Sequence, residues 1–295
     1  MGVSEREQVA QRLIGGSLKR SFDPGVDIAW DAPLEDDKWF RSPEAVSLFG
    51  TPLWEAMTDE QRRTLAREET ANTLSMGVWF ENTLNQGLLR TMLFQDPTSA
   101  HVHYSLIELG DETRHMVMFG RAVARMGARP YRLTRPQALV VQAFPLVYRG
   151  LFLWVAALCG EEWIDQAQRD QMRNPVVQPL IRRLMQIHVT EEARHIKFAR
   201  EGVRRRVQRA PWWERAFARN ANGLAAFVIH RMSVSREVYR RCGLDPCEAV
   251  RQAMANPHLL EPRQRYFAPM REFFEGQGLL NGFSRAVWRR YGFIA

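Results

Sequence analysis

Cysteine is scarce in this chain of 295 residues. Its three cysteines, Cys159, Cys242 and Cys247, form no Cys-x-x-Cys pair, and an odd number cannot all be bridged within one chain. The pattern excludes the disulfide framework that is typical of small secreted proteins and favours a reducing, cytoplasmic setting. We therefore interpret the thiols as structural residues.

Long hydrophobic runs are also nearly absent. Residues 1–20 alternate charge with short apolar stretches and lack the continuous apolar region of a signal peptide, so no export is expected. Residues 139–160 are apolar enough to suggest a membrane span. They also contain Gln142, Pro145 and Arg149, and they run directly into two glutamates. A helix buried at the centre of a bundle is the simpler interpretation, with no membrane partner.

Positive charge is in surplus, but it is not concentrated in one place. The formal net charge is +8, with 25% charged and 45% hydrophobic residues, as in an ordinary globular protein. The densest basic run, Arg204–Arg206, lies near the end of a predicted helix, where positive charge interacts favourably with the helix dipole. We therefore expect no nucleic-acid partner.

Helix breakers divide the chain and predict an all-α protein with a single domain, 1–295. We expect three helices over about 58–94, 99–127 and 137–173, the third with room for a kink at Pro145. A fourth follows Asn174-Pro175 and runs to about Gln208. These four would form a bundle core over about 58–208.

The flanking segments carry different expectations. Residues 1–57 contain four spaced prolines and predict an irregular arm with short helical turns, packed against the bundle. Residues 211–295 predict accessory helices beyond a minimal bundle, at about 212–241, 247–256, 262–275 and 284–291.

One short motif occurs twice. Glu112-Thr113-Arg114-His115 returns eighty residues later as Glu192-Ala193-Arg194-His195, and each copy has a glutamate 31 positions upstream, Glu81 and Glu161. In a helix, Glu and His at i and i+3 share a face. Two such pairs and two single glutamates are typical of a metal-ligand set inside a helix bundle.

The predicted turns support this interpretation independently. In an antiparallel helix hairpin, residues equidistant from the turn lie at similar height, because both helices advance by the same rise. The midpoint between Glu81 and Glu112 falls at Asp96-Pro97, and that of the second pair falls just past Asn174-Pro175. Each hairpin should therefore place its two glutamates at the same height along the bundle.

The donor types indicate which metals would bind. Hard oxygen and borderline nitrogen donors favour iron or manganese over a thiolate-bound zinc, and two divalent ions would balance four carboxylates. His188 lies on the same helical stripe as Glu192 and His195 and could be a third histidine ligand; a hydrogen-bonded core histidine is the alternative. The candidate ligands are Glu81, Glu112, His115, Glu161, His188, Glu192 and His195.

Two further glutamates leave alternatives open. Glu108 is the eighty-residue counterpart of His188; we interpret it as a neighbour of the ligands, with direct metal contact as the alternative. Glu162 adjoins Glu161, and only one of them can face the centre well. The 31-residue spacing selects Glu161 and leaves Glu162 as the fallback.

Residues next to the ligands could orient them. Asp111 and Glu191 precede the motif glutamates and could accept a hydrogen bond from a ligand histidine; solvated helix charges are the alternative. Arg114 and Arg194 could pair with those carboxylates or form plain surface ion pairs. Packing or surface roles are expected for His101, His103, His230 and His258, and core packing, or a pocket wall, for Trp79, Phe80 and Trp163.

The spacing of these motifs resembles a known family. Glu81, then 29 residues, then Asp111–His115, with Glu161 and His188-x3-Glu192-x2-His195 following, is similar to the p-aminobenzoate N-oxygenase family of ferritin-like diiron proteins. The resemblance spans about 58–208. Twin Glu-x-x-His motifs are common to many diiron carboxylate proteins, whereas the histidine matching His188 is more specific to this family.

The resemblance implies a ferritin-like four-helix bundle holding two iron ions, with His188 as a third histidine ligand. It implies activation of O2 as co-substrate and oxidation of an arylamine to a hydroxylamine, nitroso or nitro product. It also implies a homodimer of bacterial secondary metabolism that takes electrons from an external donor. A carbon hydroxylase or desaturase is the nearest alternative. An iron-storage or ferroxidase bundle, and a helical interaction protein, are more distant ones.

Overall fold

The computed structural model describes residues 4–295, apart from the side chains of Val140, Leu224, Arg231 and Met232. Within that part of the chain the structure is helical, with a single isolated bridge between Trp39 and Val177. Residues 1–3 of the predicted arm lie outside the described residues.

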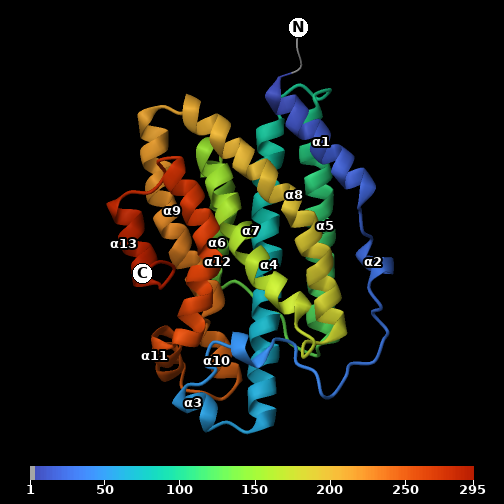
Figure 1. Cartoon of the computed structure of the whole chain (residues 1–295), viewed down its shortest axis with the longest axis vertical. Helices are drawn as coiled ribbons and strands as arrows, with labels where there is room; N and C mark the ends of the chain where they lie inside the picture. The colour runs from blue at the N-terminus through green and yellow to red at the C-terminus, as the bar shows by residue number, and fades with distance from the viewer. Residues whose placement is uncertain (1–3) are drawn as a thin grey trace.

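Two antiparallel helix hairpins form the centre of the molecule (Figure 1). The first joins α4 (Asp59–Met92) to α5 (Ala100–Arg125), and the second joins α7 (Gly150–Arg173) to α8 (Pro179–Arg209). One long crossover connects the hairpins, which is the ferritin-like arrangement. The predicted all-α, ferritin-like fold is confirmed.

Local caps fix where the first hairpin's helices begin. Thr58 and Gln61 form a reciprocal capping box at the start of α4, and Ser99 caps α5. The turns of the two hairpins lie at the predicted breaks, Asp96-Pro97 and Asn174-Pro175. Each turn is therefore centred near the midpoint of its two motif glutamates, as the level arrangement requires.

The crossover corrects one predicted helix. A continuous helix over 137–173 is wrong, because the chain forms α6 (Arg135–Val147), breaks at Tyr148-Arg149 and starts again as α7. At the break Gly150 has φ +60°, which residues with side chains rarely adopt. Glu214 accepts a hydrogen bond from the Leu151 amide at 2.7 Å and so caps the new helix from a distant part of the chain.

Burial differs between the two helices of this segment. Leu151 and Leu153 of α7 are fully buried, as expected for a central helix, but Leu139 of α6 is 67% exposed and Leu146 is 61% exposed. The expectation of a buried helix is therefore right for α7 and wrong for α6. No helix in the described part of the chain combines the length and hydrophobicity needed to cross a bilayer.

The N-terminal segment is more regular than predicted. It begins with α1 (Glu5–Lys19), which packs across α5 and α8, and only then continues as an extended arm with α2 (Pro24–Asp27), η1 (Pro43–Ala45) and α3 (Pro52–Glu55). The irregular arm is wrong for residues 5–19, because the prolines all lie after them. Packing of the segment against the bundle is confirmed.

The C-terminal helices cover the second hairpin (Figure 1). α9 and α12 pack against α7, α13 packs against α9, and α10 packs against α4 and α11. The predicted fifth helix ends eight residues early, and the predicted 262–275 helix starts at Pro257. The bounds are α9 (Trp212–Ser233), α10 (Arg236–Arg241), α11 (Pro246–Ala255), α12 (Pro257–Gly276) and α13 (Gly282–Arg290).

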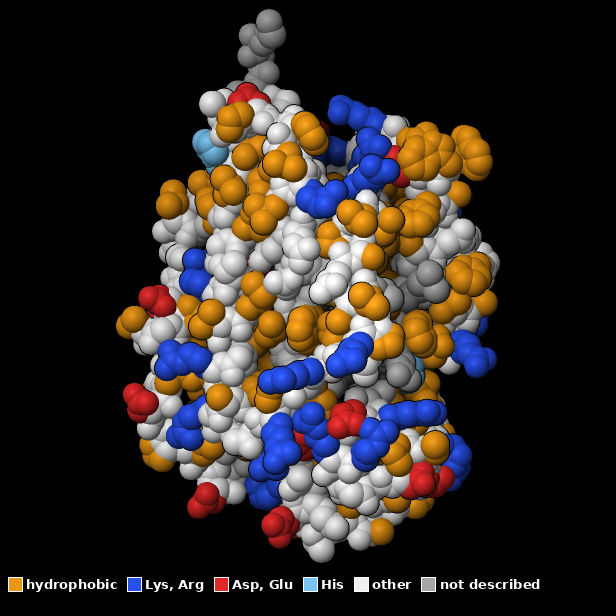
Figure 2. Space-filling model, turned by 180° about the vertical axis from the view of Figure 1, so that it is seen from behind, with side chains coloured by type: hydrophobic (Ala, Val, Ile, Leu, Met, Phe, Trp, Pro, Cys, Tyr) orange, Lys and Arg blue, Asp and Glu red, His pale blue; other side chains and the backbone are white. Residues whose placement is uncertain are grey.

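Two apolar clusters occupy the two ends of the bundle. One contains Leu84, Leu88 and the first turns of α7, and the other contains Leu65, Leu74 and the first turns of α8. Between them lies a layer of buried glutamates and histidines. On the outside, Lys and Arg side chains are interspersed with acidic and hydrophobic ones over the face in Figure 2.

Candidate metal centre

All seven predicted ligands lie in the polar layer between the apolar clusters. None of these side chains is more than 5% exposed. α4 supplies one glutamate, α5 a Glu-His pair, α7 one glutamate, and α8 a His-Glu-His set. In that order they are Glu81, Glu112, His115, Glu161, His188, Glu192 and His195.

Glu112 and Glu192 lie at the middle of the set. The Nδ1 atom of His115 is 3.2 Å from Glu112 Oε2 and 3.4 Å from Glu192 Oε1. The Nδ1 atom of His195 is 3.0 Å from Glu112 Oε1 and 3.3 Å from Glu192 Oε1. Each of these carboxylates therefore faces both histidines.

His188 makes the set asymmetric. Its Nε2 atom is 3.3 Å from Glu81 Oε1 and 3.5 Å from Glu192 Oε1. The structure therefore places His188 at the centre, on the side of Glu81, instead of in a separate core position. Glu81, His115 and His188 form one group whose donor atoms all lie within 4.8 Å of one another, and Glu112, His115 and Glu192 form another.

Several oxygen and nitrogen atoms of the proposed ligands lack any hydrogen-bond partner within the protein. They include both carboxylate oxygens of Glu161, one oxygen each of Glu81 and Glu192, and His188 Nδ1. Burying such atoms without a partner costs free energy. All four of these residues line a small chamber of about 20 Å³, together with Phe80, Phe119 and Gly160. We call it the inner chamber.

The electrostatics of the layer also favour bound cations. Burial, followed by repulsion from neighbouring carboxylates, raises the pKa of Glu81 and Glu161 well above the ordinary carboxyl value. Burial opposes charge on His115 and His195 too, but the surrounding carboxylates raise the pKa of both rings well above the imidazole value. Two divalent ions would compensate this excess of buried carboxylates, so the donor set fits a dinuclear metal site.

The predicted outer carboxylates, Asp111 and Glu191, contact the histidines in crossed pairs. His115 of α5 donates from Nε2 to Glu191 of α8 at 2.8 Å, and His195 of α8 pairs through Nε2 with Asp111 of α5 at 3.2 Å. With Nε2 protonated, the Nδ1 atom of each ring faces the centre with its lone pair available to bind a metal ion. The expected hydrogen bonds are therefore confirmed.

The repeated arginines hold the outer carboxylates. Arg114 and Arg194 both pair with Asp111, the second at 3.3 Å. The Arg194 side chain is largely buried, so its ion pair with Asp111 is not a plain surface ion pair. Its guanidinium also donates to the Arg20 carbonyl of the N-terminal arm, and the Phe22 amide of the same arm lies 3.4 Å from Glu191. The arm thus reaches the residues that orient the histidines.

The two glutamates whose roles the sequence leaves open, Glu108 and Glu162, differ in their position relative to the centre. Glu162 turns away from the centre and pairs with Arg200, which leaves Glu161 to face the inner chamber. Glu108 is buried, one of its oxygens has no hydrogen-bond partner, and burial raises its pKa to about 8. It lies outside both close donor groups, and its role beside the ligands stays a prediction.

The remaining histidines pack away from the seven residues. His101 packs at a tilt against the Phe198 ring, and burial lowers the pKa of His101 to about 3. His103 contacts the Pro97 carbonyl at the surface. His258 packs edge-on against Phe49, and His230 stacks on Tyr291. Of the flanking aromatics, Phe80 lines the inner chamber and Trp163 lines a larger cavity beside it.

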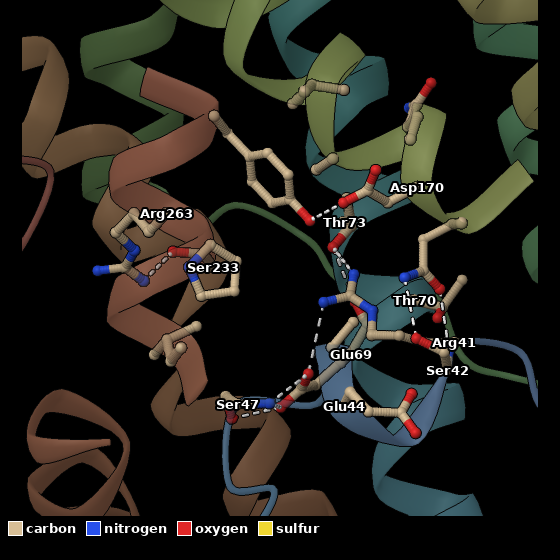
Figure 3. A pocket seen from close by; sticks show the side chains of 18 of the residues that line it. Arg41, Ser42, Glu44, Ser47, Glu69, Thr70, Thr73, Asp170, Ser233 and Arg263 are labelled. Atoms are coloured by element: carbon tan, nitrogen blue, oxygen red, sulfur yellow. Dashed lines mark hydrogen bonds and ion pairs between the residues drawn. The ribbon is translucent and has the colours of Figure 1, made fainter. Parts of the chain in front are cut away.

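That larger cavity, which we call the outer cavity, has a volume of about 460 Å³. It opens between α4, α7, α12 and the N-terminal arm, whose Arg41, Ser42 and Glu44 form part of its wall (Figure 3). Thr73, Leu74, Ile164 and Gln168 line both the outer cavity and the inner chamber. Sequence reasoning missed this cavity, because the residues that line it share no motif or spacing.

Comparisons with known proteins agree with the resemblance. The model of the family described as p-aminobenzoate N-oxygenase AurF matches residues 3–278. Uncharacterised proteins of Mycobacterium tuberculosis and Mycobacterium bovis are 29% identical over 306 residues, covering 97% of this chain and 87% of each relative.

Similar solved structures include two single-residue variants of an R2-like ligand-binding oxidase, each with a Mn/Fe cofactor. The variant whose cofactor was reconstituted anaerobically is 13% identical, with a TM-score of 0.46 over 94% of each chain. The variant whose cofactor was reconstituted aerobically is 12% identical, with a TM-score of 0.43 over 99% of this chain and 94% of that one.

Proposed function

The chain belongs to the p-aminobenzoate N-oxygenase AurF family, and we propose that it is a diiron oxygenase that oxidises an amine. The most specific form of the proposal is N-oxygenation of an arylamine to a hydroxylamine, nitroso or nitro product. The observation that carries it is the buried set of four carboxylates and three histidines between two apolar clusters.

The protein's residues would hold and isolate the metal ions. Glu81, Glu112, Glu161 and Glu192 supply the negative charge, and His115, His188 and His195 supply nitrogen donors. Two iron ions bound there would supply the O2 chemistry that no side chain provides.

The surroundings of the site would keep the reaction dry. Phe80 and Phe119 line the inner chamber, and each packs on a glycine of a neighbouring helix, Gly160 and Gly77. Aromatic rings pressed against the backbone in this way leave little room for water. Exclusion of water strengthens the electrostatic interactions within the site and limits side reactions.

The outer cavity supports a catalytic role over iron storage. A cavity of about 460 Å³ lies within the range of roughly 300–1,000 Å³ that small-molecule sites occupy. It shares four wall residues with the inner chamber, so an organic substrate could approach the metal-facing carboxylates from it. A ferroxidase has no need of such a space.

The proposal is tested by product analysis. The iron-loaded protein is reduced and exposed to O2 with a panel of arylamines, aliphatic amines and acyl substrates, and products are identified by mass spectrometry. We expect N-oxidised products from arylamines. Oxidised carbon with intact amines would instead support the hydroxylase or desaturase alternative.

A matched variant separates metal-dependent chemistry from background oxidation. His188→Ala removes the histidine that faces Glu81 and should lower both the bound iron and the product yield. His103→Ala removes a surface histidine and should leave both unchanged. Equal iron content in wild type and His188→Ala, well below two ions per chain, would contradict the diiron site.

The remaining partner assignments belong to the same proposal. The amine substrate, the external electron donor, the homodimer, the cytoplasmic location and the role in secondary metabolism stay predictions. Manganese in place of one or both iron ions is compatible with the same oxygen and nitrogen donors.

A further inference from the structure

The two cavities differ greatly in size. A water molecule needs at least about 10–15 Å³ of accessible volume, so the inner chamber of about 20 Å³ admits one small group but no aromatic ring. The outer cavity of about 460 Å³ can hold a molecule of more than one ring. A substrate must therefore keep its body in the outer cavity and extend only its reacting group towards the metal-facing carboxylates.

The wall shared by the two cavities contains two polar residues. The Thr73 hydroxyl is already engaged, because it donates to the Glu69 carbonyl at 2.9 Å and accepts from Arg41 at 2.8 Å (Figure 3). Leu74 and Ile164 offer no polar atom. The side chain of Gln168 is thus the one group of this wall with an unused hydrogen-bonding atom.

Gln168 is placed to act on a group entering the inner chamber. It follows Glu161 on α7 by two helical turns, so both side chains project from one face of the helix. The residue is 5% exposed, and its Oε1 atom has no hydrogen-bond partner in the protein. A buried amide oxygen without a donor costs free energy, and an N–H group from a ligand would offset that cost.

We propose that Gln168 is a positioning residue that accepts an N–H bond from the substrate amine where the outer cavity meets the inner chamber. The inference rests on the proposed function and narrows its substrate class. The substrate is a primary or secondary amine whose body, larger than one ring, fills the outer cavity. A tertiary amine has no N–H to donate and binds poorly.

Ligand binding to the metal-free full-length protein tests this directly. The probes are 4-phenoxyaniline, its N,N-dimethyl derivative, and 4-phenoxytoluene, in which a methyl group replaces the amino group. Calorimetry should show that the wild type binds the primary amine roughly tenfold more tightly than either analogue, the effect of about one hydrogen bond. Equal binding of all three probes, or no binding of any, would overturn the inference without recourse to a variant.

Three variants assign the effect to one atom. Gln168→Met keeps the length of the side chain without its oxygen and should abolish the preference, whereas Gln168→Glu keeps an acceptor oxygen and should retain it. Gln166→Met changes the same residue type on α7, where the side chain bonds Asp165 outside both cavities, and should behave as wild type. Circular dichroism verifies that each variant is folded.

The outcomes separate this inference from the function on which it rests. If Gln168→Met keeps the preference while the iron-loaded wild type N-oxidises 4-phenoxyaniline, the positioning role is overturned and the oxygenase stands. If the preference disappears in Gln168→Met but no amine yields an N-oxidised product, the amine site stands and the proposed function fails.

Discussion

At the scale of single residues, Glu191 contacts His115, one of the proposed metal ligands. Its carboxylate accepts a 2.8 Å hydrogen bond from His115 Nε2 and is fully buried. Glu191→Gln removes the charge that favours Nε2 protonation and should weaken metal binding by about 10–100-fold. Competition with a chelator measures this. Glu201→Gln on the same helix removes only a loose ion pair with Arg205 and serves as control; equal affinities in both variants would contradict the orienting role.

The same residues show what the sequence could and could not predict. The eighty-residue repeat identified Asp111 and Glu191, because each precedes a motif glutamate. The repeat did not reveal that they serve histidines of the opposite hairpin, since Asp111 and His115 also share a face of their own helix. Only the approach of α5 to α8 decides the pairing. Gln168 was not predicted, because an amide outside the metal-ligand repeat carries no pattern.

At the scale of elements, the close approach of α4 to α7 depends on Gly160. A Cβ atom there would lie 1.9 Å from the ring of Phe80. Phe80 directly precedes the proposed ligand Glu81, and Gly160 directly precedes the proposed ligand Glu161. Gly160→Ala should force the helices apart, destabilise the protein by about 1–3 kcal/mol and reduce metal occupancy. Chemical denaturation and metal analysis measure the two effects.

The control for this substitution is Gly120→Ala on α5. Nothing lies within 4 Å of a Cβ at Gly120, and alanine is the better helix former by about 0.5–1 kcal/mol. This variant should be neutral or slightly more stable and should bind metal normally. If Gly160→Ala matched it in both measurements, the close approach would not constrain the site.

Element boundaries were predictable where local signals set them. The turns at Asp96-Pro97 and Asn174-Pro175 follow from their own residues, so both hairpins and the level of their glutamates were foreseen. The break before α7 was not foreseen, because its capping carboxylate, Glu214, comes from α9. α1 was missed for a different reason: the helix-breaking prolines lie at 24–52, and their effect does not extend back to residues 5–19.

At the scale of the whole molecule, the acidic layer couples folding to metal and to pH. The folded-state pKa of Glu81 and Glu161 is well above the ordinary carboxyl value, and that of Glu108 is about 8. Between pH 7 and 8.5 the unfolded chain has lost these protons while the metal-free folded protein holds some of them. The free energy of unfolding of the metal-free protein should therefore fall as the pH rises through this window.

Bound metal should reverse this trend, because cations favour the ionised carboxylates and their binding releases the protons. Mn²⁺ at a concentration of about a hundred times its dissociation constant at pH 7 would add about 2.7 kcal/mol per bound ion to the free energy of unfolding. At the same Mn²⁺ concentration the gain in Tm should be larger at pH 8.5 than at pH 7, because fewer protons compete with the metal. Scanning calorimetry with and without Mn²⁺ measures both.

Glu161→Gln removes one of the titrating groups and should flatten the pH dependence of the metal-free protein. A metal-free Tm that rises with pH in both proteins would show that the acidic layer does not control stability.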